Sequence, residues 1–307
     1  MKILVTGATG FIGKNFTKRL LDKGHDVVAL GRSLDKLGAL REKVRAYAAD
    51  INDTYSLRDI IKREKPDIAA HCAAVIHTPD RKLLHRVNVE GTKSVLDACF
   101  TEGVKKVIYL STIATISANP DIPLTEDAPY KASQPYGESK IEAEKVAREY
   151  RKKGLKIAIL RPGLVYGEYE PHALERLIRM IRLRVFPVLA SEKKMHMTCV
   201  HTVVDVMMIA LANEAAYDGV FNIADKEVLT IKELGDYIAK IIGARPPWVV
   251  PVWITAFLSK IPYVRRLVFF FSKDRIYSIE RLRAKLGYAP RVSVYDGLKR
   301  AVESYVK

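Results

Sequence analysis

The chain has little cysteine, no long apolar run and too few acidic residues to balance its basic ones. Its three cysteines, Cys72, Cys99 and Cys199, lie far apart and include no Cys-x-x-Cys pair. This argues against a disulfide framework or a metal site and favours a reducing cytoplasm. No apolar stretch reaches the roughly 18 residues that a membrane-spanning helix needs. The first residues enter a strand pattern without the segments of a signal peptide, so we expect a cytoplasmic protein.

The surplus of positive charge is concentrated near the end of the chain. The 307 residues include 51 Lys and Arg against 35 Asp and Glu, a formal net charge of +16. Residues 231–307 hold 15 Lys and Arg against 6 Asp and Glu, so this quarter of the chain carries +9. A basic surface can attract an acidic ligand, a nucleic acid or an anionic lipid. No nucleic-acid-binding motif accompanies the charge, so we expect no nucleic-acid partner.

The first half of the chain alternates between short apolar runs and helical patterns. The runs fall at 2–6, 26–30, 44–48, 67–72, 105–110 and 156–160, and the helical patterns at 11–23, 55–65, 81–102 and 136–153. This alternation predicts βαβ units, and the nearly continuous apolar runs predict strands covered by helices on both faces. We therefore predict a doubly wound α/β fold, in which ligands bind at the carboxyl ends of the strands.

The pattern loosens after about residue 166. We expect helices over 172–184, 203–212, 278–286 and 294–306 and a strand over 219–224, whereas 245–271 fits no simple period. No flexible linker separates this part from the first, so we expect a smaller lobe packed over the sheet.

The first strand and the first helix are joined by a glycine-rich sequence, Thr6-Gly7-Ala8-Thr9-Gly10-Phe11-Ile12-Gly13. In this context Gly7 allows a sharp turn, Gly10 lets a pyrophosphate approach the backbone, and Gly13 lets the helix pack closely on the strand. The helix N-terminus adds N–H donors for phosphate groups. The loop therefore predicts a dinucleotide site.

The end of the second strand indicates which dinucleotide binds. NAD enzymes of this type usually place an acidic residue there to hold the ribose hydroxyls, but this chain has Gly31, followed by Arg32 and Ser33. An acid would repel a 2′-phosphate, whereas Arg32 can pair with it. We predict NADP as the preferred cofactor, with NAD as the alternative in which Arg32 is a loop residue or stacks on adenine. Asp50 and Ile51, after the third strand, are expected near the adenine, although Asp50 can equally cap a helix.

Tyr136 and Lys140 share one face at the start of the helix after the fifth strand. A tyrosine has an ordinary pKa near 10, and a neighbouring ammonium stabilises its phenolate. Lys140 can thus prepare Tyr136 as a general acid or base and also hold the nicotinamide ribose. Thr112, at the carboxyl end of the fifth strand, can bond the substrate oxygen that Tyr136 protonates. Tyr295 and Lys299 have the same spacing but lie near the C-terminus, away from the strand ends.

With these motifs in order, the chain resembles the extended short-chain dehydrogenase/reductase family, also called the NAD-dependent epimerase/dehydratase family, over essentially its whole length. Further matching segments are 71–74, 88–92, 111–112, 161–167, 200–201, 221–224 and 286–290. The resemblance implies a nicotinamide cofactor, a Thr112–Tyr136–Lys140 triplet and a substrate cleft under the C-terminal lobe. It also implies cofactor contacts from Cys72, Ala73, Ala74, Asn88, Pro162 and Gly163, although Asn88 is more often structural in this family.

The same resemblance implies how the chain is divided and assembled. We expect a dinucleotide-binding Rossmann domain of residues 1–165 plus about 196–225, and a substrate-binding lobe of about 166–195 plus 226–307. Many members of the family dimerise through the helices that correspond to 81–102 and 136–153, so we expect a homodimer.

The chain departs from the nucleotide-sugar members of the family at positions that bind a diphosphate. Those members usually carry Asn where this chain has Leu164 and often Arg where it has Met197, and their C-terminal Arg has no clear match around 273–275. The lobe sequence is instead rich in aromatic residues, namely Trp248, Trp253, Phe257, Phe269, Phe270 and Phe271. It resembles the hydroxysteroid dehydrogenase and dihydroflavonol reductase branch. The predicted reaction is hydride transfer between the nicotinamide and a ketone or secondary alcohol of a bulky, largely apolar small molecule, with Ile76, His77, Leu164, Val165 and Met197 as substrate contacts.

Three other interpretations stay open. The first is a nucleotide-sugar epimerase or dehydratase with tightly bound NAD. The second is a non-catalytic protein that senses NADP(H), although such a protein has no need of an intact triplet. The third concerns 248–258 with Arg265 and Arg266, which either form the core of the lobe or touch an anionic membrane surface.

Overall fold

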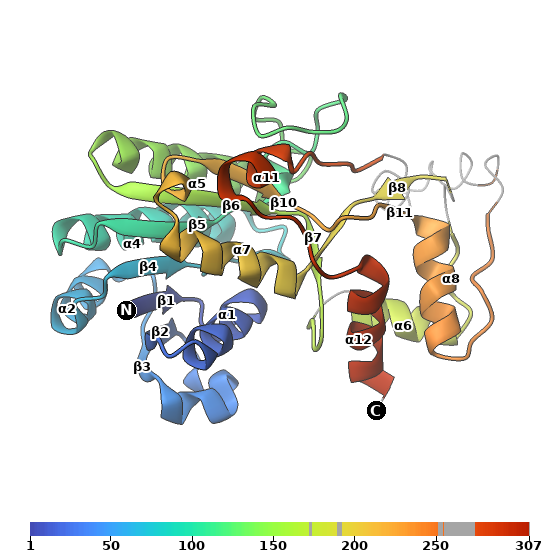
Figure 1. Ribbon diagram of the computed structural model, residues 1–307, viewed down its shortest axis with the longest axis horizontal. Coiled ribbons are helices and arrows are strands. Elements are labelled where there is room, and N and C mark those ends of the chain that lie inside the picture. Colours follow the sequence, from blue (N-terminus) through green and yellow to red (C-terminus); the bar gives the residue numbers. More distant parts are fainter. Residues whose placement is uncertain (172–173, 189–191, 251–253, 255–273, 307) are drawn as a thin grey trace.

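The computed structural model, shown in Figure 1, describes residues 1–171, 174–188, 192–250, 254 and 274–306. Its centre is a seven-stranded sheet with the strand order β10-β6-β5-β4-β1-β2-β3, in which every neighbouring pair is parallel. The strands are β1 (Lys2–Thr6), β2 (Asp26–Gly31), β3 (Arg45–Ala48), β4 (Ile68–His71), β5 (Lys106–Leu110), β6 (Lys156–Pro162) and β10 (Val220–Ile223). The predicted doubly wound α/β fold is confirmed.

Helices cover both faces of the sheet, because alternate strand side chains point to opposite sides. Leu4, Val28 and Val107 belong to the apolar core under α2 (Thr54–Glu64), α4 (Gly91–Thr101) and α5 (Pro135–Lys152). Ile3 and Ile108 belong to the core on the other face, under α1 (Phe11–Asp22), α7 (Val200–Ala212) and α11 (Glu280–Leu286). The two layers leave the carboxyl ends of the central strands open for a site.

A third apolar core lies apart from the sheet. It is built by α6 (Leu174–Arg182), α8 (Ile231–Ile241) and α12 (Val294–Val306), which Figure 1 shows grouped beyond one end of the sheet. Two short strand pairs belong to the same region, β7 (Leu164–Tyr166) with β9 (Met197–Cys199), and β8 (Lys194–Met195) with β11 (Leu229–Thr230). The predicted division of the chain into a Rossmann domain and a lobe remains our proposal, and this separate core supports it. No helix in the described part of the chain is long and apolar enough to cross a membrane.

The carboxylate of Asp225, just after β10, joins the third core to the sheet. It is fully buried and accepts hydrogen bonds from the Cys199 backbone N–H, the Thr202 hydroxyl and the Tyr166 hydroxyl at 2.8–3.0 Å. A buried carboxylate needs such donors, since leaving one unpaired is costly.

Several elements differ from the sequence expectation. The helix expected over 81–102 is divided into α3 (Arg81–Leu84), a π-helical turn (His85–Glu90) and α4. Such turns are frequent at functional sites. The 3₁₀ segment Leu34–Lys43 and helix α8 were not predicted from the sequence. A signal for α8 was present, since Thr230 and Glu233 form a capping box at its start.

Candidate active site

The loop between β1 and α1 forms a cradle without side chains. Gly7 has a φ of +68°, and a Cβ on it would lie 2.6 Å from the backbone nitrogen of Ala73. A Cβ on Gly13 would lie 2.2 Å from the carbonyl oxygen of Gly7. Gly10 is the N-cap of α1, and none of the described side chains caps that helix. The bare backbone and the N–H groups of the first turn fit the phosphates of a dinucleotide.

A chain of buried hydrogen bonds supports this loop from behind. The Thr6 hydroxyl lies 2.7 Å from His71 Nδ1 and accepts the Ala73 N–H, and His71 Nε2 lies 3.0 Å from the Thr92 hydroxyl. The Thr92 hydroxyl donates its proton to the carbonyl of Asn88, so it must accept a hydrogen bond from the Nε2–H of His71. His71 Nδ1 then carries no proton and accepts a hydrogen bond from the Thr6 hydroxyl. Burial lowers the pKa of His71 to about 3, so the ring is neutral. Thr6 therefore supports the loop and does not line the cavity.

The Asn88 side chain connects the loop after β4 to α5 through hydrogen bonds. Its side-chain oxygen accepts the Val75 N–H at 2.8 Å, and its side-chain nitrogen donates to the Val75 carbonyl at 2.9 Å and to the Ser139 hydroxyl at 3.0 Å. These bonds occupy the Asn88 amide, which gives it a positioning role. Cys72 and Ala74, in the loop that Asn88 holds, do line the cavity. Burial raises the pKa of the Cys72 thiol to about 12.

The end of β2 is shaped by close packing against the glycine-rich loop. A Cβ on Gly31 would lie 2.6 Å from Cγ2 of Thr9, so the Thr9 side chain fills the space where an acidic side chain would begin. Arg32 and Ser33, which follow, are exposed. The packing of Thr9 against Gly31 therefore leaves no room for an acidic side chain at position 31. The exposed Arg32 side chain can contact a ligand that arrives from solvent.

Asp50 and Ile51 lie on the same side of the site but play different parts. The Asp50 carboxylate accepts bonds from the backbone and side-chain nitrogens of Asn52 at 2.9 and 2.8 Å. These bonds, together with the charges of Arg32 and Arg86, hold the pKa of Asp50 below its usual range. Ile51 is buried and belongs to the core under α2 and α4.

A cavity of about 540 Å³ opens at the carboxyl ends of the central strands. The predicted residues that line it are Gly7, Gly10, Phe11, Ile12, Gly13, Cys72, Ala74, Ile76, His77, Thr112, Tyr136, Pro162, Gly163, Leu164 and Val165. The structure therefore brings the glycine-rich loop, two members of the predicted triplet and most of the predicted substrate contacts into one cavity. Thr6, Thr9, Arg32, Ser33, Asp50, Ile51, Ala73, Asn88, Lys140 and Met197 are not part of its lining.

Thr112 and Tyr136 both line this cavity. Burial raises the pKa of Tyr136 to about 12, and its hydrogen bond with Thr112 opposes that rise. The sequence argument expected the Lys140 ammonium to lower this pKa. In the structure desolvation dominates, so Tyr136 is a protonated phenol at neutral pH and is ready to donate.

Lys140 lies beneath the cavity, with 1% of its surface exposed. Its ammonium donates to the carbonyl of Leu110 at 2.9 Å and lies 4.3 Å from the centre of the Tyr109 ring. Burial lowers the pKa of Lys140 to about 7, and the carboxylate of Glu144 opposes this shift. A small change in its surroundings therefore changes the charge of Lys140 near neutral pH.

A buried ion pair, which the sequence analysis missed, stands behind the triplet. The Glu144 carboxylate accepts two hydrogen bonds from Arg161 at 2.8 and 2.6 Å, one from the Ser111 hydroxyl at 2.5 Å and one from the Tyr130 hydroxyl at 2.7 Å. Glu144 and Arg161 are at most 1% exposed. The spacing Lys140-x-x-x-Glu144 was the available signal, since it places both side chains on one face of α5.

The β7–β9 pair sets two predicted substrate contacts side by side, because Leu164 pairs with Met197. Leu164 is 43% exposed and lines the cavity, whereas Met197 is 3% exposed and belongs to the lobe core. Met195 and His196 line the cavity in its place. Met197 was predicted to contact the substrate, but the residues that line the cavity are one and two positions earlier in the chain. Neighbouring residues of an extended strand point to opposite faces, so Met197 points into the lobe core while His196 faces the cavity.

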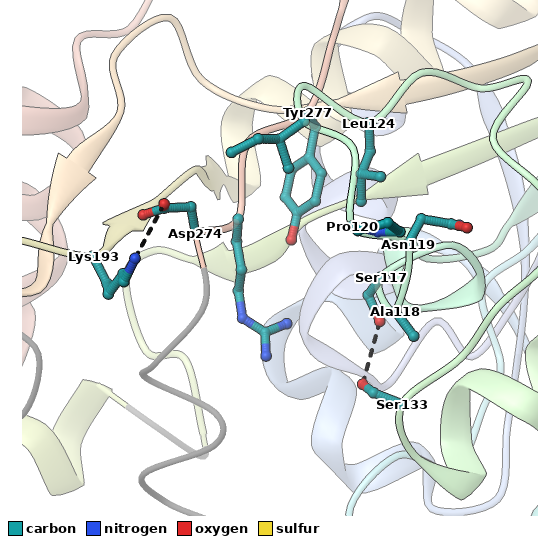
Figure 2. A pocket seen from close by; sticks show the side chains of 11 residues that line it. Ser117, Ala118, Asn119, Pro120, Leu124, Ser133, Lys193, Asp274 and Tyr277 are labelled. Carbon is teal, nitrogen blue, oxygen red and sulfur yellow. Dashed lines mark hydrogen bonds and ion pairs between the residues drawn. The ribbon is translucent and has the colours of Figure 1, made fainter. Parts of the chain in front are cut away.

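A smaller pocket of about 300 Å³ adjoins the cavity and shares Ser117, Ser133, Arg275 and Tyr277 with it. Figure 2 shows the ion pair of Lys193 with Asp274, 3.5 Å apart, on one side of this pocket and the contact of Ser117 with Ser133 on the other. The sequence showed no clear match for a C-terminal arginine at 273–275. The structure brings Arg275 to both pockets, because its backbone bonds to β8 and to His196.

The other Tyr-x-x-x-Lys pair lies elsewhere. Tyr295, on α12, packs edge to face on Tyr237 and is 40% exposed. The aromatic residues Trp253, Phe257 and Phe269–Phe271 and the pair Arg265 and Arg266 lie outside the described residues. Trp248 is described and is 55% exposed.

Comparison with known proteins places this site in a family. The model of the NAD dependent epimerase/dehydratase family matches residues 3–224. The chain belongs to this family. Mouse (Mus musculus) sterol-4-alpha-carboxylate 3-dehydrogenase, decarboxylating, is 26% identical over 338 residues, covering 99% of the chain and 91% of the relative. The relatives include dehydrogenases and epimerases, so the protein is an enzyme of the oxidoreductase type as predicted, epimerase chemistry included.

Two solved structures share the whole fold. UDP-glucose 4-epimerase from Thermotoga maritima, solved with UDP-glucose, has a TM-score of 0.83 at 25% identity and covers 100% of this chain and 99% of its own. UDP-glucuronic acid 4-epimerase from Bacillus cereus, solved with NAD, has the same TM-score at 24% identity and the same coverage. The second likeness concerns the fold alone.

Proposed function

We propose that this protein transfers a hydride between a nicotinamide cofactor and a ketone or secondary alcohol of a bulky, largely apolar substrate. The observation that carries the proposal is a single cavity that Thr112 and Tyr136 line together with apolar side chains. The glycine-rich loop opens into the same cavity, so a cofactor held there lies within reach of both hydroxyls.

The residues of the chain supply the proton chemistry of this reaction. The nicotinamide, when bound, gives or takes the hydride at the substrate carbon. In the direction of reduction the Tyr136 phenol donates its proton to the carbonyl oxygen, and Thr112 donates a hydrogen bond to the same oxygen. In oxidation the same proton returns to the Tyr136 oxygen. Lys140, beneath the cavity, favours the anionic form of Tyr136 while it is itself protonated.

The lining of the cavity favours an apolar substrate over a diphosphate. Ile76 and Leu164 are 44% and 43% exposed, and they lose contact with water when an apolar molecule covers them. Ile113, Val165 and Met195 continue the apolar lining. Each Å² of apolar surface removed from water contributes about 25 cal/mol.

A thermal-shift panel tests this substrate class. With NADP present we expect hydrophobic ketones and alcohols to raise the melting temperature, and uridine, guanosine and thymidine diphosphate sugars to leave it unchanged. Leu164→Asn should reduce the shift caused by apolar ligands. Val306→Asn is the matched control, because Val306 is 45% exposed at the end of α12, outside the cavity lining. Stabilisation by diphosphate sugars alone would contradict the proposal.

That opposite result would favour the second candidate, a nucleotide-sugar epimerase or dehydratase that retains NAD. The observation in its favour is the pocket in Figure 2, which Lys193 and Arg275 line next to the cavity, together with the Asp274 carboxylate that pairs with Lys193. Two cations can meet a diphosphate through charge-assisted hydrogen bonds. The cofactor that co-purifies is a second measurement, because an epimerase of this kind keeps NAD and a reductase exchanges NADP.

We further infer that NADP is preferred over NAD. Arg32 is exposed at the end of β2, and the packing of Thr9 on Gly31 leaves no acid there to repel a 2′-phosphate. By titration calorimetry, NADPH should bind at least about tenfold tighter than NADH, a difference of about 1.4 kcal/mol. Arg32→Ala should remove most of that gap. Arg41→Ala, in the next segment and paired with Asp35, is the control and should leave the gap intact.

We also propose that the enzyme is a cytoplasmic homodimer in which α4 and α5 of two copies pack together. Phe100, near the end of α4, is 44% exposed and supports this face as an interface. Light scattering should give twice the chain mass of 34.6 kDa, and Phe100→Asp should shift the equilibrium toward one copy. A monomer across the working concentration range would exclude this arrangement.

A further inference from the structure

Two adjoining segments of the lobe carry large exposed apolar side chains, which we call the lobe strip. This lobe strip consists of Leu183, Val185, Trp248 and Val249, which are 60%, 56%, 55% and 42% exposed. Its two segments lie side by side, since the Val188 N–H donates to the Trp248 carbonyl at 2.9 Å. Single exposed apolar residues are ordinary, but a group of large ones on adjoining segments indicates an interaction surface.

Four arginines lie in α6 and in the segment that follows it, close in sequence to Leu183 and Val185. Arg176, Arg179 and Arg182 lie on the outer face of α6, and Arg184 follows the helix directly, between two members of the strip. All four are exposed, and within the described part of the chain none of their guanidinium groups makes an ion pair or a hydrogen bond. Glu175 is the acidic residue of α6. The guanidinium groups are therefore available to an anionic partner.

We propose that this end of the lobe binds the surface of an anionic phospholipid bilayer and lies on it without crossing it. Arginine charges meet anionic headgroups, and leucine, valine and tryptophan side chains enter the boundary between headgroups and acyl chains. The combination of arginines with exposed apolar side chains favours a bilayer over other partners. An apolar protein partner has no need of four exposed arginines, and a nucleic acid has no need of an exposed apolar strip. The charge of +9 in residues 231–307 adds long-range attraction to the same kind of surface.

This inference goes beyond the proposed function and does not depend on it. None of the residues of the strip and none of the four arginines lines the cavity. Loss of membrane binding therefore leaves the reaction untouched, and a wrong substrate class leaves the membrane proposal untouched.

Vesicle sedimentation with the full chain is the test. We expect binding to vesicles that contain phosphatidylglycerol and none to vesicles of phosphatidylcholine alone. Binding should weaken as salt rises, since the screening length falls from about 10 Å at 0.1 M to about 3 Å at 1 M. Arg179→Glu with Arg182→Glu should lower the partition coefficient at least about tenfold. Lys18→Glu with Lys23→Glu makes the same change of charge at exposed positions of α1 and its C-cap, and should have little effect.

Tryptophan fluorescence reports on the strip directly. The chain has two tryptophans, and Trp253→Phe leaves Trp248 as the source of emission. Anionic vesicles should shift that emission to the blue, and brominated lipids should quench it. Equal melting temperatures of the variants show that they are folded.

Four results would overturn the proposal. The first is a protein that stays in the supernatant with anionic vesicles. The second is equal loss of binding in the α1 and α6 charge variants, which would indicate attraction by net charge. The third is sedimentation with no change in Trp248 emission. The fourth is tighter binding to double-stranded DNA than to vesicles, with the DNA binding weakened by the same α6 variant.

Discussion

Removing the charge of Glu144 should lower the melting temperature of this enzyme strongly, although the change leaves the protein surface as it is. Glu144→Gln keeps the shape of the side chain but leaves the Arg161 guanidinium buried without its counter-charge. Breaking a buried pair from one side costs about 3–5 kcal/mol. At about 2–3 °C per kcal/mol for a chain of this size, the melting temperature should fall by roughly 6–15 °C.

A control on the same helix separates this effect from a general loss of charge. Glu142→Gln removes a carboxylate from α5 that pairs with Lys145 at 2.8 Å, but both side chains are about half exposed. Such a pair contributes at most about 1 kcal/mol. Differential scanning calorimetry of the two variants makes the comparison.

The double variant Glu144→Leu with Arg161→Met tests the cause. Because it removes both charges, it should be more stable than Glu144→Gln, as replaced buried ion pairs often are. If Glu144→Gln differed from Glu142→Gln by less than about 1 kcal/mol, or if the double variant were the least stable, the reasoning from burial would be refuted.

Three further changes test the site itself. Tyr136→Phe should lower turnover by about 10²–10⁴-fold and leave cofactor affinity nearly unchanged, as steady-state kinetics and titration will show. Lys140→Met should melt at a higher temperature than the wild type near pH 7, and the difference should close toward pH 10.5. Burial lowers the pKa of Lys140 from 10.5 to about 7, so the folded wild type gains stability as the pH rises between these values. A wild type that melts at a higher temperature than the variant at every pH would contradict this. Gly13→Ala should weaken cofactor binding by more than about tenfold, since its Cβ would lie 2.2 Å from the Gly7 carbonyl and must displace the loop, and unchanged affinity would exclude the phosphate cradle.

The sheet and the glycine-rich loop could be predicted because their signals are local. The apolar runs that became β1, β2 and β5 were each complete within a few residues, and Gly7, Gly10 and Gly13 mark a turn and a helix start within one loop. A buried parallel strand has the same apolar character along its whole length, whatever its distant partners. These features therefore depend little on the rest of the chain.

The parts that were missed depend on contacts far along the chain. Strands β7 and β9 have three residues each and exist only through their pairing, so no periodicity marked them. Arg275 reaches the cavity because its backbone bonds to residues near 195, about 80 positions earlier. The protonated state of Tyr136 follows from desolvation of its phenol in the folded chain, which a Tyr-x-x-x-Lys spacing does not contain. Arg161 stands inside an apolar strand, and only the fold shows that it meets Glu144.

The hydrogen bonds of Tyr166 can form only late in the synthesis of the chain. The Tyr166 hydroxyl donates to Asp225 and also reaches the carbonyl of Val294, 128 residues later in the chain. A Cβ on Gly297 would lie 2.6 Å from that same hydroxyl, so α12 closes tightly over it. At about 5–20 residues per second, those 128 residues take roughly 6–26 s to make. The last strand of the sheet, β10, is already complete by then, but α11, which covers one face of the sheet, ends only at Leu286, so that face is covered only shortly before α12 closes over Tyr166.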